Sequence, residues 1–331
     1  MNLIPLLLLL PNLVQQEMAE RKVPGAALAI VQDGRVVYSA GFGIANADTG
    51  EPVRAEMLFR AGSTTKMMTA AALVKLSLAG KIALDEPIGN RIPKLPEPLR
   101  PLTANQLLSH TSGLIPDTGY DGSHDDDGLA KNIMGWDAKR FAQAPGTGYL
   151  YSNHGYALAG YLVEVLSGKS FADAVEELVF QPAGMQRTTF RPLVAMTWPL
   201  AQGHDNGAVV RPIADHTGFW PAGSMYTSVL EMSKFAAAFM DRSFDPKVVQ
   251  LMTTPRVAIP KTQNEQYGYG LALDKYRGTT RWRHSGARKG YGSMAIFLPD
   301  RKLAIVLMTN ETGVSLPKTL EKIQEMLVTA P

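Results

Sequence analysis

A serine and a lysine three positions apart are the side chains of this sequence best suited to chemistry. Ser63 and Lys66 follow Gly62, and the segment 67–74 after them, which contains three alanines and two methionines, is typical of a helix. Residues three apart on a helix share a face, so the hydroxyl and the amine would be neighbours. A serine becomes a good nucleophile when a base takes its proton, and a buried, uncharged lysine can be that base. The helix N-terminus adds backbone N–H donors that suit an oxyanion.

This spacing alone is weak evidence for a catalytic site, because the chain contains it twice. Ser315 and Lys318 repeat it, but Pro317 in the first turn indicates an ordinary helix start there. The importance of Ser63 therefore depends on other motifs in the chain.

Two further motifs follow Ser63 and Lys66 in order. Tyr151 and Asn153 form the only Tyr-x-Asn of the chain. His284, Ser285 and Gly286 lie in a segment that is typical of a strand. Together they place a phenol, an amide and an imidazole in a fixed order behind the serine–lysine pair.

The three motifs, in this order, resemble those of the serine β-lactamase and penicillin-binding-protein-like superfamily. The resemblance is strongest to its class C-type branch, which also contains family VIII carboxylesterases, D-aminopeptidases and DD-peptidases. It covers about residues 12–328, and similar phrases occur at 23–27, 107–114 and 221–228. The chain has no Gly-x-Ser-x-Gly sequence, which disfavours a conventional α/β-hydrolase.

The resemblance implies a role for three catalytic residues. Ser63 would attack a carbonyl and form an acyl-enzyme, with Lys66 as proton acceptor or electrostatic partner. Tyr151 would activate Ser63 and later the deacylating water. A tyrosine acts as an anion only beside positive charge, which Lys66 or His284 could supply. The sequence leaves open whether Lys66 or Tyr151 holds the proton.

Further residues are expected to bind substrate. Asn153 would orient Lys66 and contact the substrate carbonyl region, although an asparagine there could instead cap a helix beginning near residue 154. The oxyanion hole would use the backbone N–H groups of Ser63 and Ala287. The strand residues expected to border the substrate are His284, Ser285, Gly286 and Ala287.

His284 stands where β-lactamases of this superfamily carry a lysine that supports recognition of a substrate carboxylate. A neutral histidine is a weaker anion anchor near pH 7, and Arg288 or Lys289 could compensate. The residue therefore favours a carboxylesterase acting on small esters. A β-lactamase, DD-peptidase or D-aminopeptidase is the alternative, and a non-catalytic binding member of the fold is a second alternative.

Composition narrows the remaining possibilities. The chain has 331 residues, a formal net charge of +3 and no cysteine, so disulfides and cysteine chemistry are excluded. We expect no nucleic-acid partner, no obligatory membrane, no cofactor and no metal; the oligomeric state is left open. The apolar segment 3–10 lacks a preceding basic residue and a following cleavage site. These features favour a first helix packed on the protein over a signal peptide. A cytoplasmic location is therefore expected rather than a periplasmic or secreted one.

Strand patterns lie at both ends of the chain and helix patterns lie between them. Segments 26–31 and 35–40 flank an Asp-Gly turn and predict a hairpin, and three more strands are expected near the C-terminus at 281–288, 293–298 and 303–308. A final helix is expected over 315–328. Since a hairpin is not stable alone, one sheet should combine both ends. The resemblance implies the same mixed α/β fold: an antiparallel sheet flanked by helices (1–62 and 215–331), an inserted, mostly helical domain (63–214), and an active site between them.

Overall fold

The computed structural model describes residues 4–116, 123–211, 215–241 and 243–329 of the chain. Its strands are β1 Gly25–Gln32, β2 Arg35–Asn46, β3 Glu51–Pro52, β4 Phe59–Arg60, β5 His204–Asp205, β6 Ala208–Val209, β7 Tyr226–Thr227, β8 Val257–Ala258, β9 Gln266–Tyr267, β10 Ala272–Tyr276, β11 Thr279–Arg288, β12 Tyr291–Leu298 and β13 Leu303–Thr309. Its α-helices are α1 Ile4–Arg21, α2 Lys66–Leu78, α3 Ala104–Leu108, α4 Gly128–Met134, α5 Asn153–Ser167, α6 Phe171–Val175, α7 Pro192–Ala195, α8 Trp220–Gly223, α9 Val229–Asp241, α10 Pro246–Met252 and α11 Pro317–Thr329.

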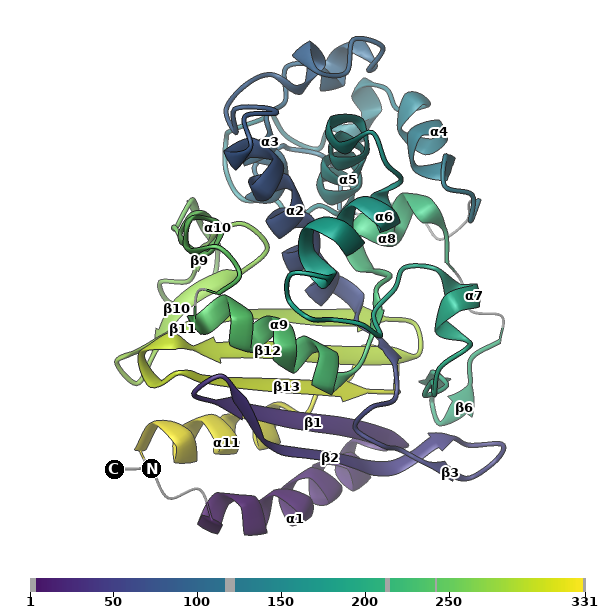
Figure 1. Cartoon of the computed structure of the whole chain (residues 1–331), viewed down its shortest axis with the longest axis vertical. Helices are drawn as coiled ribbons and strands as arrows, with labels where there is room; N and C mark the ends of the chain where they lie inside the picture. The colour runs from purple at the N-terminus through teal and green to yellow at the C-terminus, as the bar shows by residue number, and fades with distance from the viewer. Residues whose placement is uncertain (1–3, 117–122, 212–214, 242, 330–331) are drawn as a thin grey trace.

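A nine-stranded antiparallel sheet forms the lower half of the molecule (Figure 1). Its strand order is β3-β2-β1-β13-β12-β11-β10-β9-β8. The first strand, β1, pairs with the last, β13, from Ala26 opposite Thr309 to Gln32 opposite Leu303. The two ends of the chain therefore build one sheet, and the prediction of an antiparallel sheet flanked by helices is confirmed.

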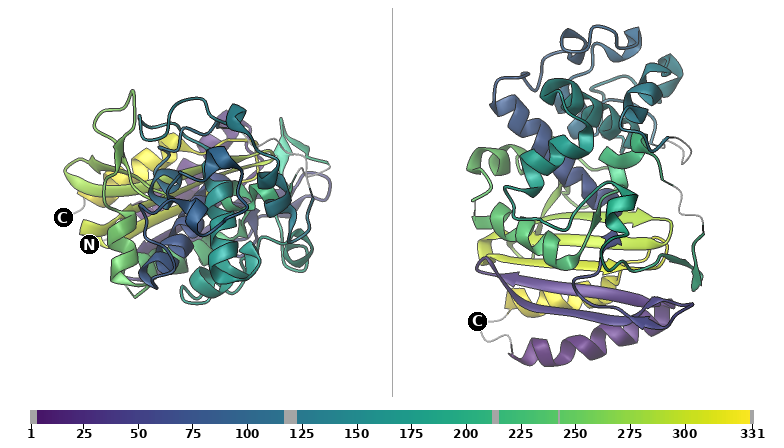
Figure 2. Two further views of the ribbon diagram at one scale, coloured as in Figure 1. Left: turned by 90° about the horizontal axis from the view of Figure 1, so that it is seen from above. Right: turned by 45° about the vertical axis from the view of Figure 1, so that its right-hand side comes forward.

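Strand β1 has no polar side chain before its last residue, Gln32, because both faces of the sheet are covered. Ala27 and Ala29 belong to the core shared with α2 and α9, whereas Leu28 and Ile30 belong to the core shared with α1 and α11. Successive strand side chains point to opposite faces, so neither set can be polar without losing a buried surface. Figure 1 and the right-hand view of Figure 2 show α1 and α11 on the side of the sheet away from the helical part.

The local predictions agree with the structure, with small shifts. Asp33 and Gly34 form the β1–β2 turn with φ values of +50° and +75°, the left-handed geometry that favours Asp-Gly in tight hairpins. The last helix begins at Pro317, two residues later than expected, and β11 begins at Thr279, two residues earlier. Helix and strand ends are the least certain features of a sequence pattern because end residues make few local hydrogen bonds.

The helical part lies on the other side of the sheet. The short turn Gly62–Thr65 that leads into α2 lies against β11, and α2 itself packs against α5, α8 and α10, so this segment joins the sheet to the upper helices (Figure 1). The domain boundaries expected at residues 62/63 and 214/215 stay a prediction, and residue 214 lies outside the described residues. None of the helices among the described residues is both long and apolar enough to cross a lipid bilayer.

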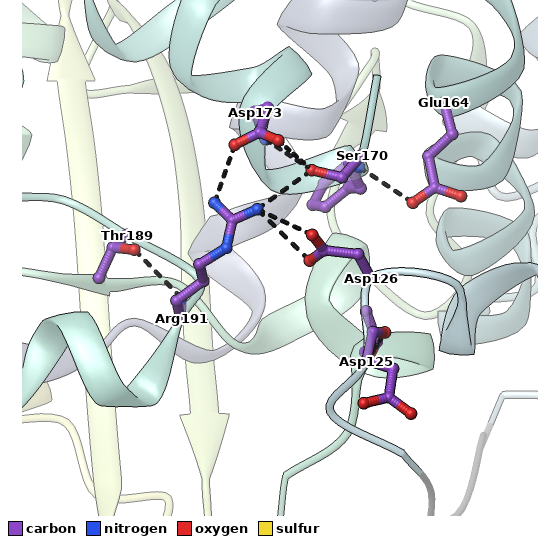
Figure 3. A network of polar contacts seen from close by, with 9 residues as sticks. Asp125, Asp126, Glu164, Ser170, Asp173, Thr189 and Arg191 are labelled. Atoms are coloured by element: carbon purple, nitrogen blue, oxygen red, sulfur yellow. Dashed lines mark hydrogen bonds and ion pairs between the residues drawn. The ribbon is translucent and has the colours of Figure 1, made fainter. Parts of the chain in front are cut away.

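Arg191 connects separate pieces of the helical part, as Figure 3 shows. Its guanidinium donates to Asp173 Oδ1 at 2.9 Å, to Ser170 Oγ at 3.2 Å and to both oxygens of Asp126 at 3.3 Å. Next to this network, the Glu164 carboxylate accepts the Phe171 N–H at 2.9 Å and so covers the first turn of α6. Burial, and then the charges of the nearby carboxylates of Asp126 and Asp127, raise the pKa of Glu164 to about 7.

Replacing Glu164 by glutamine is therefore expected to stabilise the protein at pH 8 and to have little effect at pH 5. The unfolded carboxyl loses its proton near pH 4.5 and the folded one near pH 7, so stability falls as the pH rises between these values. A shift of this size corresponds to at most about 3 kcal/mol, and glutamine keeps an oxygen for the Phe171 N–H. Urea unfolding at both pH values measures the difference.

The exposed Glu177 provides the matched control for this prediction. Its side chain is 55% exposed, so Glu177→Gln should change the free energy of unfolding by less than about 0.5 kcal/mol at either pH. An equal effect of Glu164→Gln at pH 5 and pH 8 would contradict the raised pKa.

Candidate active site

The turn that carries Ser63 is pressed against strand β11. Residues Gly62–Thr65 form a short 3-10 helix that leads directly into α2. Gly62 has a φ of +54°, and a Cβ at this position would lie 2.7 Å from the backbone nitrogen of Ala287. A glycine is required here because it adopts this backbone conformation and leaves room for the strand. Ser63 is thereby held beside β11.

Lys66 is fully buried under Ser63. Its Nζ lies 3.3 Å from Ser63 Oγ, 2.8 Å from Asn153 Oδ1 and 2.7 Å from the carbonyl oxygen of Ala222. Burial, and then the positive charge of Arg288, hold the pKa of Lys66 well below its usual value. In the neutral amine, the two N–H groups can donate to Asn153 and Ala222, which leaves the lone pair to accept the Ser63 proton.

The phenol ring of Tyr151 lies next to Lys66. Lys66 Nζ lies 4.7 Å from the centre of the Tyr151 ring. Burial raises the pKa of Tyr151 far above its ordinary value, while a hydrogen bond with the Ser63 side chain acts in the opposite direction. The structure therefore brings the hydroxyl, the amine and the phenol together, and the environment favours the neutral form of both Lys66 and Tyr151.

The buried ring of His110 supports the loop of Tyr151. Its ring centre is 4.2 Å from that of Tyr151, and its Nδ1 accepts the backbone N–H of Ser152 at 3.0 Å. Burial, followed by the charge of Lys66, holds the pKa of His110 well below its usual value. A neutral ring at this place keeps its lone pair for the loop, which fixes the position of Tyr151.

Asn153 is free for the site because its neighbour caps the helix. Ser152 is the N-cap of α5, and its hydroxyl accepts the N–H of Gly155 at 3.0 Å. The alternative that Asn153 itself caps this helix is wrong, since Asn153 is the first helical residue and its side-chain oxygen accepts from Lys66. The predicted orienting contact between Asn153 and Lys66 is thus present.

His284 is a neutral, fully engaged histidine, so the expectation that it could supply positive charge to Tyr151 is wrong. Its Nδ1 lies 2.6 Å from the carbonyl oxygen of Ser285, which can only accept, so this nitrogen carries the proton. Its Nε2 lies 3.0 Å from Tyr267 Oη and accepts that hydroxyl. Burial, and then the charge of Lys66, lower the pKa of His284 to about 3.

Arg288 does not take over as an exposed anion anchor either. Its guanidinium is buried, lies 3.3 Å from Asp215 Oδ1 and packs 4.1 Å from the centre of the Phe219 ring. The second half of the sequence expectation, compensation by Lys289, stays a prediction.

Of the four strand residues expected to border the substrate, Gly286 and Ala287 lie in contact with the nucleophile turn. A Cβ at Gly286 would lie 2.1 Å from the carbonyl oxygen of Ala61 and 3.0 Å from the backbone nitrogen of Ser63. The alternating burial of β11 leaves Ser285 and Ala287 exposed and Gly286 buried. This register brings the backbones of Ser63 and Ala287 close together, as an oxyanion hole requires, and that role for their N–H groups stays a prediction.

A pocket of about 270 Å³ opens beside Tyr151 and Ser285. Three tyrosines and two charged side chains are among the residues that line it, which are Tyr149, Tyr151, Ile259, Glu265, Tyr267, Ala272, Arg283, His284, Ser285 and Met294. Glu265 and Arg283 pair with each other inside the wall. Sequence reasoning missed this pair and Tyr267, because they come from β9, its flanking loop and β11 and share no local motif.

Comparison with known proteins agrees with the geometry. The family model described as beta-lactamase matches residues 10–326. Penicillin-binding protein 4 of Amycolatopsis lactamdurans is 28% identical over an alignment of 319 positions that covers 88% of this chain and 82% of that protein. D-aminopeptidase of Gluconobacter oxydans is 29% identical over 87% of this chain and 56% of its own length. Esterase EstB of Burkholderia gladioli is 34% identical over 53% of this chain and 49% of its own length.

Solved structures support the same assignment. The octameric penicillin-binding protein homologue from Pyrococcus abyssi superposes with a TM-score of 0.83 at 28% identity, covering 96% of this chain and 76% of that one. D-alanine carboxypeptidase AmpC from Burkholderia cenocepacia superposes with a TM-score of 0.82 over 100% of both chains, and at 24% identity it supports the fold alone. The chain therefore belongs to the beta-lactamase family of serine hydrolases.

Proposed function

We propose that this protein is a carboxylesterase that hydrolyses small esters through an acyl-enzyme on Ser63. The observation that carries the proposal is His284, whose two ring nitrogens are occupied by Ser285 and Tyr267. A neutral ring with no spare donor cannot anchor an anionic group of a substrate. An ester with no obligatory negative charge needs no such anchor.

The reaction starts with proton transfer from Ser63 to Lys66. Ser63 Oγ attacks the ester carbonyl carbon, and the proton moves to the Lys66 lone pair at 3.3 Å. The carbonyl oxygen becomes an oxyanion held by the N–H groups of Ser63 and Ala287. Collapse of this intermediate breaks the bond to the alcohol, which leaves with the proton relayed through Lys66 and Tyr151 and so restores the neutral amine.

Deacylation repeats the sequence with water as the nucleophile. Tyr151 and Lys66 take a proton from the water while its oxygen attacks the acyl carbon, and the proton returns to Ser63 Oγ as the acid leaves. Because Lys66 must be neutral at the start, ester turnover should fall as the pH decreases through the lowered pKa of Lys66. A fall of this kind would assign the role of proton acceptor to Lys66, a choice that the sequence left open.

Hydrolysis of a peptide or a β-lactam is the second candidate, and one feature of the pocket favours it. The Arg283 side chain is 32% exposed and could face a substrate carboxylate. Its pairing with Glu265, together with Asp274 at 3.9 Å, neutralises much of that charge, so we place this candidate second. The D-aminopeptidase and penicillin-binding proteins among the relatives keep it open to test.

The test is a panel of p-nitrophenyl acetate, butyrate and octanoate beside nitrocefin and a D-alanyl peptide. We expect the short esters to be turned over with the highest kcat/KM, and intact-protein mass spectrometry after rapid quenching to find the acyl group on Ser63. Ser63→Ala should remove both the turnover and the adduct. Preferential hydrolysis of nitrocefin or the peptide would select the second candidate, and ester turnover that survives Ser63→Ala would contradict the proposal.

A further inference from the structure

A buried carboxylate that the reaction does not use lies behind the active site. Only 2% of the Asp215 side chain is exposed. Its Oδ1 accepts from Arg60 at 2.6 Å, from the Ser224 hydroxyl at 2.7 Å and from Arg288 at 3.3 Å. Its Oδ2 accepts the indole N–H of Trp220 at 3.2 Å. Four hydrogen-bond donors therefore surround this one carboxylate. Their hydrogen bonds replace those to water that the carboxylate loses on burial.

The four donors belong to three different parts of the catalytic machinery. Arg60 ends β4, three residues before Ser63. The carbonyl oxygen of its neighbour Ala61 accepts the hydroxyl of Thr64 in the nucleophile turn. Arg288 ends β11, directly after Ala287. The other two donors, Trp220 and Ser224, are the first residue and the C-cap of α8, and the carbonyl of Ala222 between them accepts from Lys66.

We infer that Asp215 is a positioning residue that holds the nucleophile turn, the end of β11 and the lysine acceptor of α8 in one arrangement. The inference rests on the proposed function, since it concerns the alignment of Ser63 with Lys66 and the oxyanion donors. The three segments are far apart in the sequence. Backbone hydrogen bonds join β4 to the residues directly after α8, such as the Ala61 N–H to the Met225 carbonyl oxygen at 2.8 Å, and among the described residues none joins either of these segments to Arg288 at the end of β11. A single carboxylate between them fixes their relative positions, and a displacement of about 1 Å in such a site can cost a factor of 10² in rate.

The charges around Asp215 support the same role. Two buried guanidiniums, those of Arg60 and Arg288, pair with the Asp215 carboxylate. Arg288 is also the cation that acts on Lys66. Asp215 thus holds the Arg288 guanidinium in place. The position of this guanidinium in turn affects the pKa of Lys66, the proposed base.

The test measures how fast Ser63 displaces fluoride from a fluorophosphonate in Asp215→Asn and Asp215→Ala. Asparagine keeps one acceptor oxygen, so we expect the maximal labelling rate to fall about tenfold, and about 100-fold for alanine. The half-saturating concentration of the reagent should change less than threefold, because no contact with the reagent is removed. Ser224→Ala, which removes a single donor, should fold like the wild type and lose several-fold in the same rate.

Glu17→Gln is the matched control. Glu17 is a buried carboxylate that accepts from Lys318 N at 3.1 Å and Thr319 N at 2.6 Å, on the opposite face of the sheet. This variant should lower the melting temperature while it labels Ser63 at the wild-type rate, which separates positioning from general destabilisation.

The outcomes distinguish the inference from the proposed function. A wild-type protein that labels on Ser63, with folded Asp215 and Ser224 variants that label equally fast, would overturn the inference and leave the proposed function intact. A slow rate in Glu17→Gln equal to that of Asp215→Asn would overturn it as well. A wild-type protein that does not label on Ser63 would overturn both.

Discussion

Replacing Lys66 by methionine is expected to lower kcat for a short ester by a factor of about 10³ or more. Methionine fills similar volume but has no lone pair for the Ser63 proton. It also leaves Asn153 Oδ1 and the Ala222 carbonyl without the donor that lies 2.8 Å and 2.7 Å away. The loss should appear in kcat, since the lysine acts on the nucleophile rather than on ground-state binding.

The pH dependence makes this prediction specific. In the wild type, activity should fall as the pH drops through the lowered pKa of Lys66, because the ammonium form cannot take a proton. The residual activity of Lys66→Met should not show this fall. Initial rates from pH 5 to pH 9, corrected for active protein, measure both effects.

Lys75 is the control on the same helix. It donates to the carbonyl oxygen of Leu178 at 2.8 Å and packs over the Phe244 ring, away from Ser63. Lys75→Met should stay within about threefold of the wild-type activity, as a substitution without contact to the reacting groups normally does. Retention of more than a tenth of the activity by Lys66→Met would refute the assignment of Lys66 as the base.

The second large effect is expected from Gly286→Ala. The added methyl group would lie 2.1 Å from the Ala61 carbonyl oxygen, 2.3 Å from Ser293 Oγ and 3.0 Å from the backbone nitrogen of Ser63. Real Cβ contacts are not this short, so β11 or the nucleophile turn must move. Either movement separates the two N–H groups proposed for the oxyanion, and we expect kcat/KM to fall by a factor of about 10² to 10³.

Stability and activity can be separated for this variant. Overpacking of a tight site typically costs about 1–3 kcal/mol, so Gly286→Ala should remain folded at 20 °C and the rate per folded molecule can be measured there. Gly135→Ala is the control, because its nearest neighbour would be the Asn132 carbonyl oxygen at 3.6 Å and its φ of −87° suits any residue. A folded Gly286→Ala enzyme with wild-type kcat/KM would contradict the predicted contact between β11 and the turn.

Much of the fold follows from local patterns in the sequence. The apolar segment that became β1 and the Asp33–Gly34 turn predicted the hairpin, because strand alternation and turn geometry depend on neighbouring residues. The joining of β1 to β13 was predicted only in outline, since register depends on pairing between residues more than 270 positions apart. The change to a π-helix over Glu176–Phe180, after α6, had no local signal that we recognised.

The sequence by itself determined which groups could react: Ser63 and Lys66 three residues apart at the start of a helix, with Tyr151 and Asn153 as partners. Tertiary structure decided their chemical state. His284 is neutral because folding buries it between Tyr267 and the Ser285 carbonyl, and Lys66 meets the Ala222 carbonyl, a backbone group with no side-chain signature. Charge and proton position depend on burial and on contacts between distant segments, and no spacing along the chain records either of them.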